Sequence, residues 1–112
     1  MLSDDSSDKI VVAEISLIAL LKGKTGMSKE IAAAFAAIKN TKGLKVTLTG
    51  MGTQVESGNL ENILAAVEAA HRAVIKIGAS RVISTIRIDQ RLDKAQTLDD
   101  RVLTVKEKLG EI

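Results

Sequence analysis

A single carboxylate interrupts one of the most apolar stretches of the chain. Glu14 lies within residues 10–21, where Ser16 is the only other polar residue, and both fall on one face of the predicted strand. A carboxylate in such surroundings requires a partner, either a cation or a ligand. Arg87, on a later predicted strand, is the expected cation if the two residues share a sheet face. Ligand contact and ion pairing therefore both stay open for Glu14.

A second polar group lies near the middle of the chain, in residues 45–56. Val46 and Leu48 alternate with polar residues there, which predicts two short strands joined across residues 50–52. The two glycines of this turn free the backbone for a tight or bulged turn and leave room for a close neighbour. Thr47 and Thr49 are also compatible with an ordinary solvent-facing strand. Together with Glu14 and the glycine turn, they favour a binding site without catalytic machinery.

Catalytic and metal-binding signals are weak. Glu14 could pair with Glu56 or with Asp89 for acid–base chemistry, but the sequence does not fix their separation. His71 is the only histidine and the chain has no cysteine, which disfavours a metal site. His71 lies on the apolar side of a predicted helix with no nucleophile indicated nearby, so we interpret it as a packed or interfacial histidine. The sequence predicts no enzyme activity, no metal and no cofactor.

The loop after the first predicted strand resembles a phosphate-binding loop only in part. Residues 23–25 read Gly-Lys-Thr, but the full pattern needs a glycine where Ile18 stands. Lys22 and Lys24 could still attract an anion. An acylphosphatase-type enzyme would need an arginine in this loop, and the loop has none. RNA binding on a sheet of this kind uses aromatic side chains, which the predicted strands lack.

Composition narrows the class of protein further. The chain has 112 residues, of which 46% are apolar, so it can bury a core, and Phe35 is its only aromatic residue. Its 16 basic and 14 acidic residues are dispersed, which disfavours a nucleic-acid partner. The N-terminus lacks an apolar signal region, and no apolar run is long enough for a membrane span. We expect a soluble cytoplasmic protein with no nucleic-acid or membrane partner.

The elements that position these residues follow from periodicity and capping signals. Residues 1–8 are expected to be a disordered tail, and residues 9–112 a single domain. Strands are predicted at residues 10–21 and 81–89, on either side of the central hairpin. The predicted helices begin at the N-caps Ser28, Asn59 and Thr97. The first is expected to end near Gly43 and the second at Gly78, and the third carries the apolar seam Leu98, Val102, Val105 and Leu109.

This order of elements predicts the fold. A β-α-β-β-α-β pattern followed by a helix indicates an α+β, ferredoxin-like sandwich, with a four-stranded antiparallel sheet, two helices on one face and an extra C-terminal helix. The uncovered sheet face is expected to carry a set of polar residues among aliphatic ones: Glu14, Ser16, Thr47, Thr49, Thr85 and Arg87. Such a face needs a cover, and a partner subunit is the simplest one.

Several of these segments together resemble the small thiamine-binding protein family, formerly an uncharacterised family. The similarity runs from about Lys9 to Leu109, and its most specific parts are Met-Gly-Thr at residues 51–53 and Ile-Asp-Gln-Arg at residues 88–91. Gly50 stands where the family usually has proline. The resemblance implies subunits that form dimers and tetramers through the sheet, and that bind thiamine or its hydroxymethylpyrimidine half without catalysing a reaction.

The candidate ligand-binding residues follow from this resemblance. Hydrogen-bonding groups on the open face would hold the aminopyrimidine, a carboxylate would favour the thiazolium cation, and Met51 would supply a polarizable apolar contact. The full set is Glu14, Ser16, Thr49, Met51, Gly52, Thr53, Thr85 and Arg87. The alternative is a structural or regulatory oligomer whose polar sheet face is only an interface.

Overall fold

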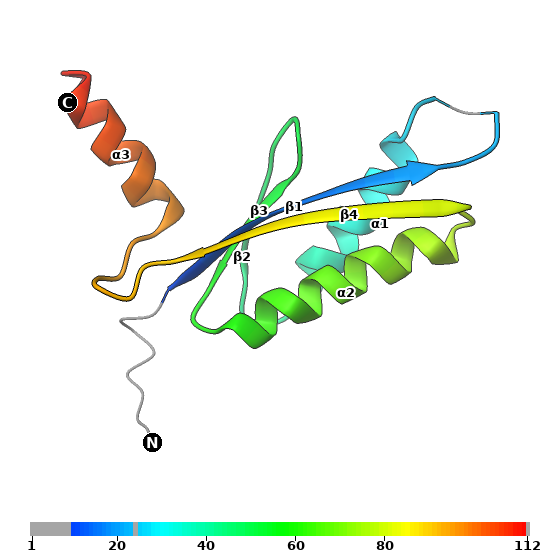
Figure 1. The fold of residues 1–112 in the computed structure, drawn as a ribbon, viewed down its shortest axis with the longest axis horizontal. Helices are drawn as coiled ribbons and strands as arrows, with labels where there is room; N and C mark the ends of the chain where they lie inside the picture. Colours follow the sequence, from blue (N-terminus) through cyan, green and yellow to red (C-terminus); the bar gives the residue numbers. More distant parts are fainter. Residues whose placement is uncertain (1–9, 24, 112) are drawn as a thin grey trace.

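The computed structural model describes residues 10–23 and 25–111, which form four strands and three helices (Figure 1). In chain order these elements are β1 (Val11–Leu20), α1 (Ser28–Lys39), β2 (Lys45–Leu48), β3 (Thr53–Ser57), α2 (Leu60–Lys76), β4 (Arg81–Gln90) and α3 (Leu98–Lys108). The tail expected at residues 1–8 lies outside the described residues. No helix in the described part of the chain is long and apolar enough to span a lipid bilayer.

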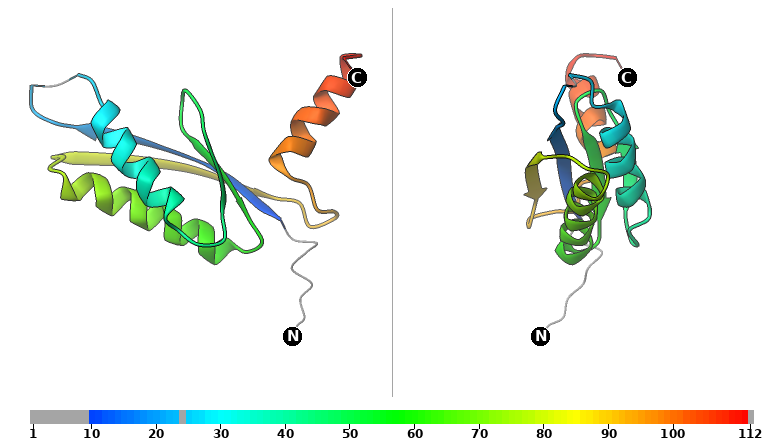
Figure 2. Two further views of the ribbon diagram at one scale, coloured as in Figure 1. Left: turned by 180° about the vertical axis from the view of Figure 1, so that it is seen from behind. Right: turned by 90° about the vertical axis from the view of Figure 1, so that its right-hand side faces the viewer.

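The strands form one sheet in the order β2-β3-β1-β4, and all neighbouring strands are antiparallel. Helices α1 and α2 pack together on one face of this sheet (Figure 2). The predicted α+β class, with a four-stranded antiparallel sheet, is therefore confirmed. The face opposite to α1 and α2, which we call the open face, is the one expected to carry the polar residues.

Strand β1 is central to both the sheet and the core. Its alternate residues Val11, Ala13, Ile15, Leu17 and Ala19 are buried against the helices, as the period of two predicts. Ile15, Ile38 and Ile63 are at most 1% exposed. Burying a side chain of this size contributes about 1.5–3 kcal/mol, so an aliphatic core replaces the missing aromatic residues.

Two of the three predicted helix caps are confirmed. The side chain of Asn59 accepts a hydrogen bond from the backbone N–H of Asn62 at the start of α2. Thr97 forms a reciprocal capping box with Asp100 at the start of α3. Ser28 was the wrong choice for α1, because it is the first helical residue and Met27 occupies the cap position without a side-chain capping bond. The helix also ends at Lys39, before Gly43.

Strand β1 is longer than its neighbour β3. The pairing with β3 ends at Ile15 opposite Thr53, whereas the pairing with β4 continues to Leu20 opposite Arg81. Among residues 10–23 and 25–111, no other strand pairs with β1 on the β3 side beyond Ile15. One edge of β1 is therefore left without a strand partner over its last five residues, 16–20.

Helix α3 extends from the body of the molecule (Figures 1 and 2). None of its residues is buried, and Val102, Val105 and Leu109 of the predicted apolar seam are 55%, 58% and 68% exposed. Within α3, Leu98 and Arg101 are half-buried, and both lie in the first turn. The predicted seam exists, but it does not pack on its own sheet.

Candidate functional site

The register of the strands brings the predicted polar residues onto the open face. Glu14 lies opposite Arg87 on β4 and opposite Gln54 on β3, and Ser16 lies opposite Thr85. Thr47 on β2 faces Gln54 from the other side. Since directly paired residues of antiparallel strands point to the same face, these side chains form one continuous polar strip.

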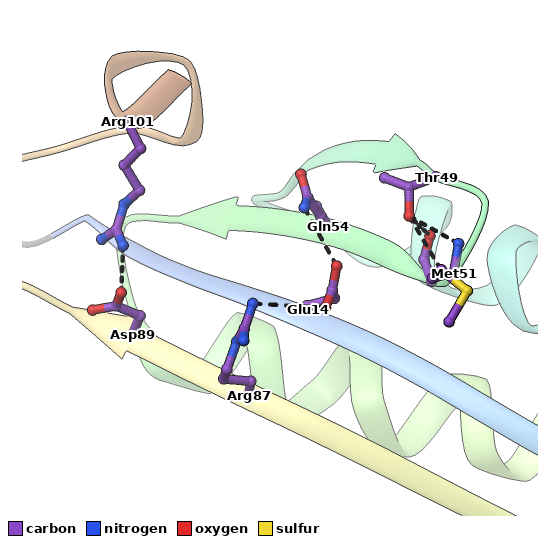
Figure 3. A network of polar contacts seen from close by, with 8 residues as sticks. Glu14, Thr49, Met51, Gln54, Arg87, Asp89 and Arg101 are labelled. Carbon is purple, nitrogen blue, oxygen red and sulfur yellow. Dashed lines mark hydrogen bonds and ion pairs between the residues drawn. The ribbon is translucent and has the colours of Figure 1, made fainter. Parts of the chain in front are cut away.

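Glu14 is held by two side chains (Figure 3). Its Oε2 accepts a hydrogen bond from Gln54 Nε2 at 3.4 Å, and its Oε1 lies 3.8 Å from Arg87 Nη2. The predicted pairing with Arg87 is thus present but long, and the Arg87 side chain is 83% exposed. An ion pair of this kind contributes about 1 kcal/mol or less. The Glu14 carboxylate is therefore oriented by its neighbours but can still contact a ligand.

A pocket of about 310 Å³ surrounds this carboxylate at the end of the sheet nearest α3. We call it the charged pocket, and its charged lining residues are Glu14, Lys45, Glu56, Arg87, Asp89, Asp99 and Arg101. Four of these are acidic and three are basic. At neutral pH the pocket therefore carries one more negative than positive charge, which favours a cationic ligand.

The first turn of α3 closes the charged pocket through polar contacts with three strands. Lys45 Nζ donates to Asp99 Oδ2 at 2.9 Å, and Arg101 forms an ion pair with Asp89 on β4 (Figure 3). The backbone N–H of Leu98 donates to Glu56 Oε1 at 3.1 Å. The hydrogen bond from Arg101 lowers the pKa of Asp89, and the hydrogen bond to Asp99 raises the pKa of Lys45. Both groups are consequently charged around neutral pH.

A second pocket, of about 320 Å³, lies beyond the end of β3, beneath the loop that joins β2 to β3. We call it the hairpin pocket. Its walls are mostly apolar and come from β1, the start of α1 and the loop: Ile15, Leu17, Ile18, Met27, Ile31, Ala34 and Met51. Ser16, Thr49, Gly50, Gly52 and Thr53 complete the lining.

The loop over the hairpin pocket is held by Thr49. Its hydroxyl donates to the carbonyl of Gly52 at 2.8 Å and accepts from the backbone N–H of Gly52 at 3.1 Å. Gly50 and Gly52 do not have the positive φ that would itself require glycine. A Cβ on Gly52 would lie 2.9 Å from the carbonyl oxygen of Ile15, whereas a Cβ on Gly50 would meet nothing within 4 Å. Glycine at position 52 is therefore explained by close approach to β1.

The predicted site residues divide between the two pockets. Glu14 and Arg87 line the charged pocket, and the hairpin pocket takes Ser16, Thr49, Met51, Gly52 and Thr53. Thr85 lies on the open face but lines neither pocket. Glu14 and Ser16 are two residues apart on one strand, about 7 Å along β1, so the pockets are neighbours. Which of these residues contact a ligand stays a prediction.

Comparison with known proteins decides the family. A family model described as "Thiamine-binding protein" matches residues 13–106. The chain belongs to this family. A UPF0045 protein of Methanothermobacter thermautotrophicus is 39% identical over 100 residues, which cover 89% of this chain and all of the relative. The UPF0045 protein MJ1052 of Methanocaldococcus jannaschii is 39% identical over 97 residues, which cover 87% of this chain and 93% of the relative.

Solved structures agree with this assignment. A crystal structure of MJ1052 matches with a TM-score of 0.78 at 38% identity, covering 88% of this chain and 97% of that one. A Thermotoga maritima protein, for which a role in thiamine biosynthesis or salvage has been suggested, matches with a TM-score of 0.66 and covers 86% of this chain and 98% of its own. Its 20% identity supports a common fold alone. The sequence-based recognition of the thiamine-binding protein family is confirmed.

The structure also shows site residues that sequence reasoning missed. Gln54 donates a hydrogen bond to Glu14. Because the hairpin pairs Gln54 with Thr47, a residue already predicted on the open face, the sequence could have placed Gln54 on that face as well. Asp99 and Arg101 close the charged pocket from α3, a helix that the sequence places far from β1. No local pattern could indicate that contact, because it depends on how the chain folds back after β4.

His71 has a polar partner that the sequence did not reveal. Its Nδ1 lies 2.6 Å from the Ser84 hydroxyl of β4, so the expectation that no nucleophile lies nearby was wrong. Within the described residues, no carboxylate is hydrogen-bonded to the ring, as it would be in a catalytic triad. No group of three or more potential metal ligands was found in the described part of the chain. The contact between His71 and Ser84 connects α2 to β4.

Proposed function

We propose that this member of the thiamine-binding protein family binds thiamine or its hydroxymethylpyrimidine half, without catalysing a reaction, as a carrier, buffer or sensor. The observation that carries the proposal is the oriented Glu14 carboxylate in a pocket with an excess of negative charge. Family membership supports the same ligand class, and the thiamine-related role suggested for the Thermotoga protein, whose fold this chain shares, is compatible with it.

The chemistry of the two pockets suits the two halves of thiamine. The thiazolium ring carries a fixed positive charge, which the acidic excess of the charged pocket favours. The neutral aminopyrimidine requires an apolar slot with a few hydrogen-bonding groups, which the hairpin pocket offers. Met27 and Met51 supply polarizable contacts in place of aromatic stacking.

A binding role without catalysis agrees with the state of the titratable groups. The pKa of Asp89 is lowered by its hydrogen bond from Arg101, so this carboxyl remains ionised and is a poor general acid near neutral pH. Asp99 and Glu56 are likewise engaged as hydrogen-bond acceptors for α3. These groups hold the pocket closed.

We further propose a ferredoxin-like subunit that assembles through its sheet into dimers and then tetramers. The strand order β2-β3-β1-β4 supports the ferredoxin-like assignment. The open face presents Ile18, Leu20 and Ile83, which are 46%, 44% and 38% exposed, and apolar side chains of this size on one face favour a protein partner.

Isothermal titration with thiamine and with hydroxymethylpyrimidine tests the ligand. Wild-type protein should release heat with both compounds. Glu14→Gln keeps the shape of the side chain but removes its charge. It should weaken thiamine binding about tenfold or more, because the fixed charge of the thiazolium loses an opposite charge at short range. Glu61→Gln, an exposed substitution in the first turn of α2, is the matched control. The absence of both binding heat and a thermal shift at millimolar ligand would overturn the proposal.

The second candidate is a structural or regulatory oligomer without a small ligand. The exposed apolar seam of α3 favours this alternative, because it requires a protein partner and no small molecule. Light scattering after size-exclusion chromatography distinguishes the two. A change of assembly state in Glu14 and Arg87 variants, with no ligand binding by the wild type, would select this candidate.

A further inference from the structure

Strand β4 forms one edge of the sheet over all ten of its residues, Arg81–Gln90. In the described part of the chain, β1 is the only strand that pairs with β4, and their pairing contains no bulge. The edge at β2 is shorter, with four residues. A long, regular edge presents unpaired N–H and C=O groups and is a template for another strand. The outer edge of β4 is therefore where a second chain can extend this sheet.

The backbone groups on the outer edge of β4 belong to alternate residues. The carbonyl of Leu20 points toward β4, because it accepts a hydrogen bond from the N–H of Ser80 at 2.9 Å. Leu20 is paired with Arg81, and residues paired in this way direct their N–H and C=O groups at each other. Arg81 and every second residue after it therefore bond β1. The residues between them direct their N–H and C=O groups outward: Val82, Ser84, Ile86 and Ile88.

A second copy of the chain supplies a strand of matching length and pattern. Two identical strands that pair antiparallel are related by a two-fold axis, so every contact occurs twice. Outward groups must meet outward groups, which requires the axis to pass through a residue rather than between two residues. The registers that pair most of β4 place the axis at Ser84, Thr85 or Ile86. These three registers differ in the side chains that they bring together on the open face.

Charge distinguishes the three registers. The first sets Arg81 opposite Arg87 of the second copy, and like charges directly opposite each other are destabilising. The third sets Asp89 opposite the apolar Ile83. The second, with the axis at residue 85, sets Arg81 opposite Asp89, so that two pairs of opposite charge form across the interface. Asp89 forms its ion pair within the subunit through Oδ2, which leaves Oδ1 for the second copy.

An apolar groove on α2 lies beside the same edge. It has a volume of about 340 Å³. Its lining residues are Leu64, Val67, Glu68, His71, Arg72 and Ile75. The contact of His71 with Ser84, at 2.6 Å, places the groove next to the middle of β4. Leu64 and Ile75 are 50% and 52% exposed, and apolar side chains beside an open strand edge favour a protein partner there.

The axis at Thr85 also brings the two grooves level with each other. Helix α2 runs antiparallel to β4, and His71 is level with Ser84 (Figure 1). With rises of about 1.5 Å per helical residue and about 3.3 Å per strand residue, Leu64 lies about 7 Å from the axis in one direction and Ile75 about 9 Å in the other. The two-fold axis exchanges these directions, so Leu64 of one subunit comes level with Ile75 of the other.

We propose that the outer edge of β4 binds the β4 strand of a second copy, antiparallel and with the two-fold axis at Thr85. Two four-stranded sheets then become one sheet of eight strands, flanked by the two α2 helices. The inference rests on the proposed assembly through the sheet and names the strand that forms the contact. Both open faces stay free in this pair, so two pairs packed through these faces give the proposed tetramer.

Single-cysteine variants test the register, since the chain has no cysteine of its own. The Cα atoms of a directly opposed pair without ladder hydrogen bonds lie about 4.5 Å apart, within the range of a disulfide. Thr85→Cys should therefore form a disulfide-linked dimer under mild oxidation, measured by non-reducing gel electrophoresis. Ile83→Cys, on the same face, is the matched control, because its two copies lie about 13 Å apart and should stay unlinked. Equal linkage of the two variants would overturn this register.

A reversal of charge tests the pair between Arg81 and Asp89. Arg81→Glu places a carboxylate opposite Asp89 of the second copy, so the dissociation constant of the β4 dimer should rise at least tenfold, measured by analytical ultracentrifugation. Lys42→Glu makes the same change of charge at an exposed residue between α1 and β2, and it should leave that constant unchanged. Equal effects of the two substitutions would contradict the pair.

The wild-type protein separates this inference from the proposed function. Light scattering should show an oligomer in which the outward amides of Ser84 and Ile86 exchange slowly with solvent. An oligomer in which these two amides exchange as fast as those of a free strand edge would overturn the β4 interface and leave the open-face assembly standing. A monomer at high micromolar concentration would overturn both, whatever the ligand titrations show.

Discussion

The charged pocket and the hairpin pocket use the same strand in different ways. The charged pocket takes side chains from β1, β2, β3 and β4, and α3 completes it through hydrogen bonds and ion pairs. The hairpin pocket lies beside the part of β1 that the short strand β3 does not reach, and its lining is mostly apolar. A site of charged side chains can be retuned by one substitution, whereas a gap beside a strand is set by the lengths and register of the strands.

The largest effect should come from the core that supports both pockets. Ile63 on α2 is fully buried and lines neither pocket. Ile63→Ala should lower the free energy of unfolding by about 2–5 kcal/mol, measured by chemical denaturation. The ratio of thiamine to hydroxymethylpyrimidine affinity should stay constant, and a change in that ratio would show that the pockets do not share one support. Ile75→Ala, at a residue 52% exposed on the same helix, is the control.

The next largest effect should come from salt, which should weaken binding in the charged pocket but not in the hairpin pocket. Thiamine binding depends on exposed charges in the charged pocket, and the screening length falls from about 10 Å at 0.1 M salt to about 3 Å at 1 M. Thiamine affinity should therefore fall several-fold over this range in titration calorimetry. Hydroxymethylpyrimidine affinity should hold or rise slightly. Equal losses for the two ligands would place both rings in the charged pocket.

A smaller effect is expected from loosening the loop over the hairpin pocket. Thr49→Val removes the hydroxyl that bonds both backbone groups of Gly52. The expected cost is about 1–3 kcal/mol of stability, with faster hydrogen exchange at Met51 and Gly52. Thr47→Val, on the neighbouring exposed strand position, is the comparison, and equally fast exchange in that variant would contradict the role given to Thr49.

The smallest effect concerns pH and the attachment of α3. The pKa of Asp89 is lowered from its ordinary 3.8, so its contribution is present above pH 3.8 and is lost as pH falls through the lower native value. The pKa of Lys45 is raised from 10.5, so its contribution is present below pH 10.5 and is lost as pH rises through the higher native value. Amide chemical shifts of α3 should therefore stay constant from about pH 5 to 9. A transition inside that window would contradict the two contacts.

The contrast between the pockets also explains what the sequence could predict. The period of two in β1 and β4 placed Glu14 and Arg87 on one face, and the cap signals at Asn59 and Thr97 located two helices, because all of these are local patterns. The contacts of Asp99 and Arg101 could not be predicted, since they join residues far apart in the chain. Ser28 failed as a cap because Met27 is already placed there, with its sulfur against β1.

The hairpin pocket was the hardest to predict for a related reason. Residues such as Ser16 and Met51 were selected for their side chains, and they do line it. The free edge of β1 depends on where β3 begins relative to β1, which no residue of β1 indicates by itself. Register is a property of two strands together, so one strand's sequence does not reveal it.

The short β3 strand has a consequence for protein engineering. A β2–β3 loop lengthened by a few strand-forming residues would let β3 continue beside residues 16–20 of β1, and the chain's own amides would then occupy the edge. Such an insertion would add ladder hydrogen bonds while removing the cavity. A more stable protein that no longer takes up the pyrimidine would show that the length of one hairpin sets the balance between a complete sheet and a receptor.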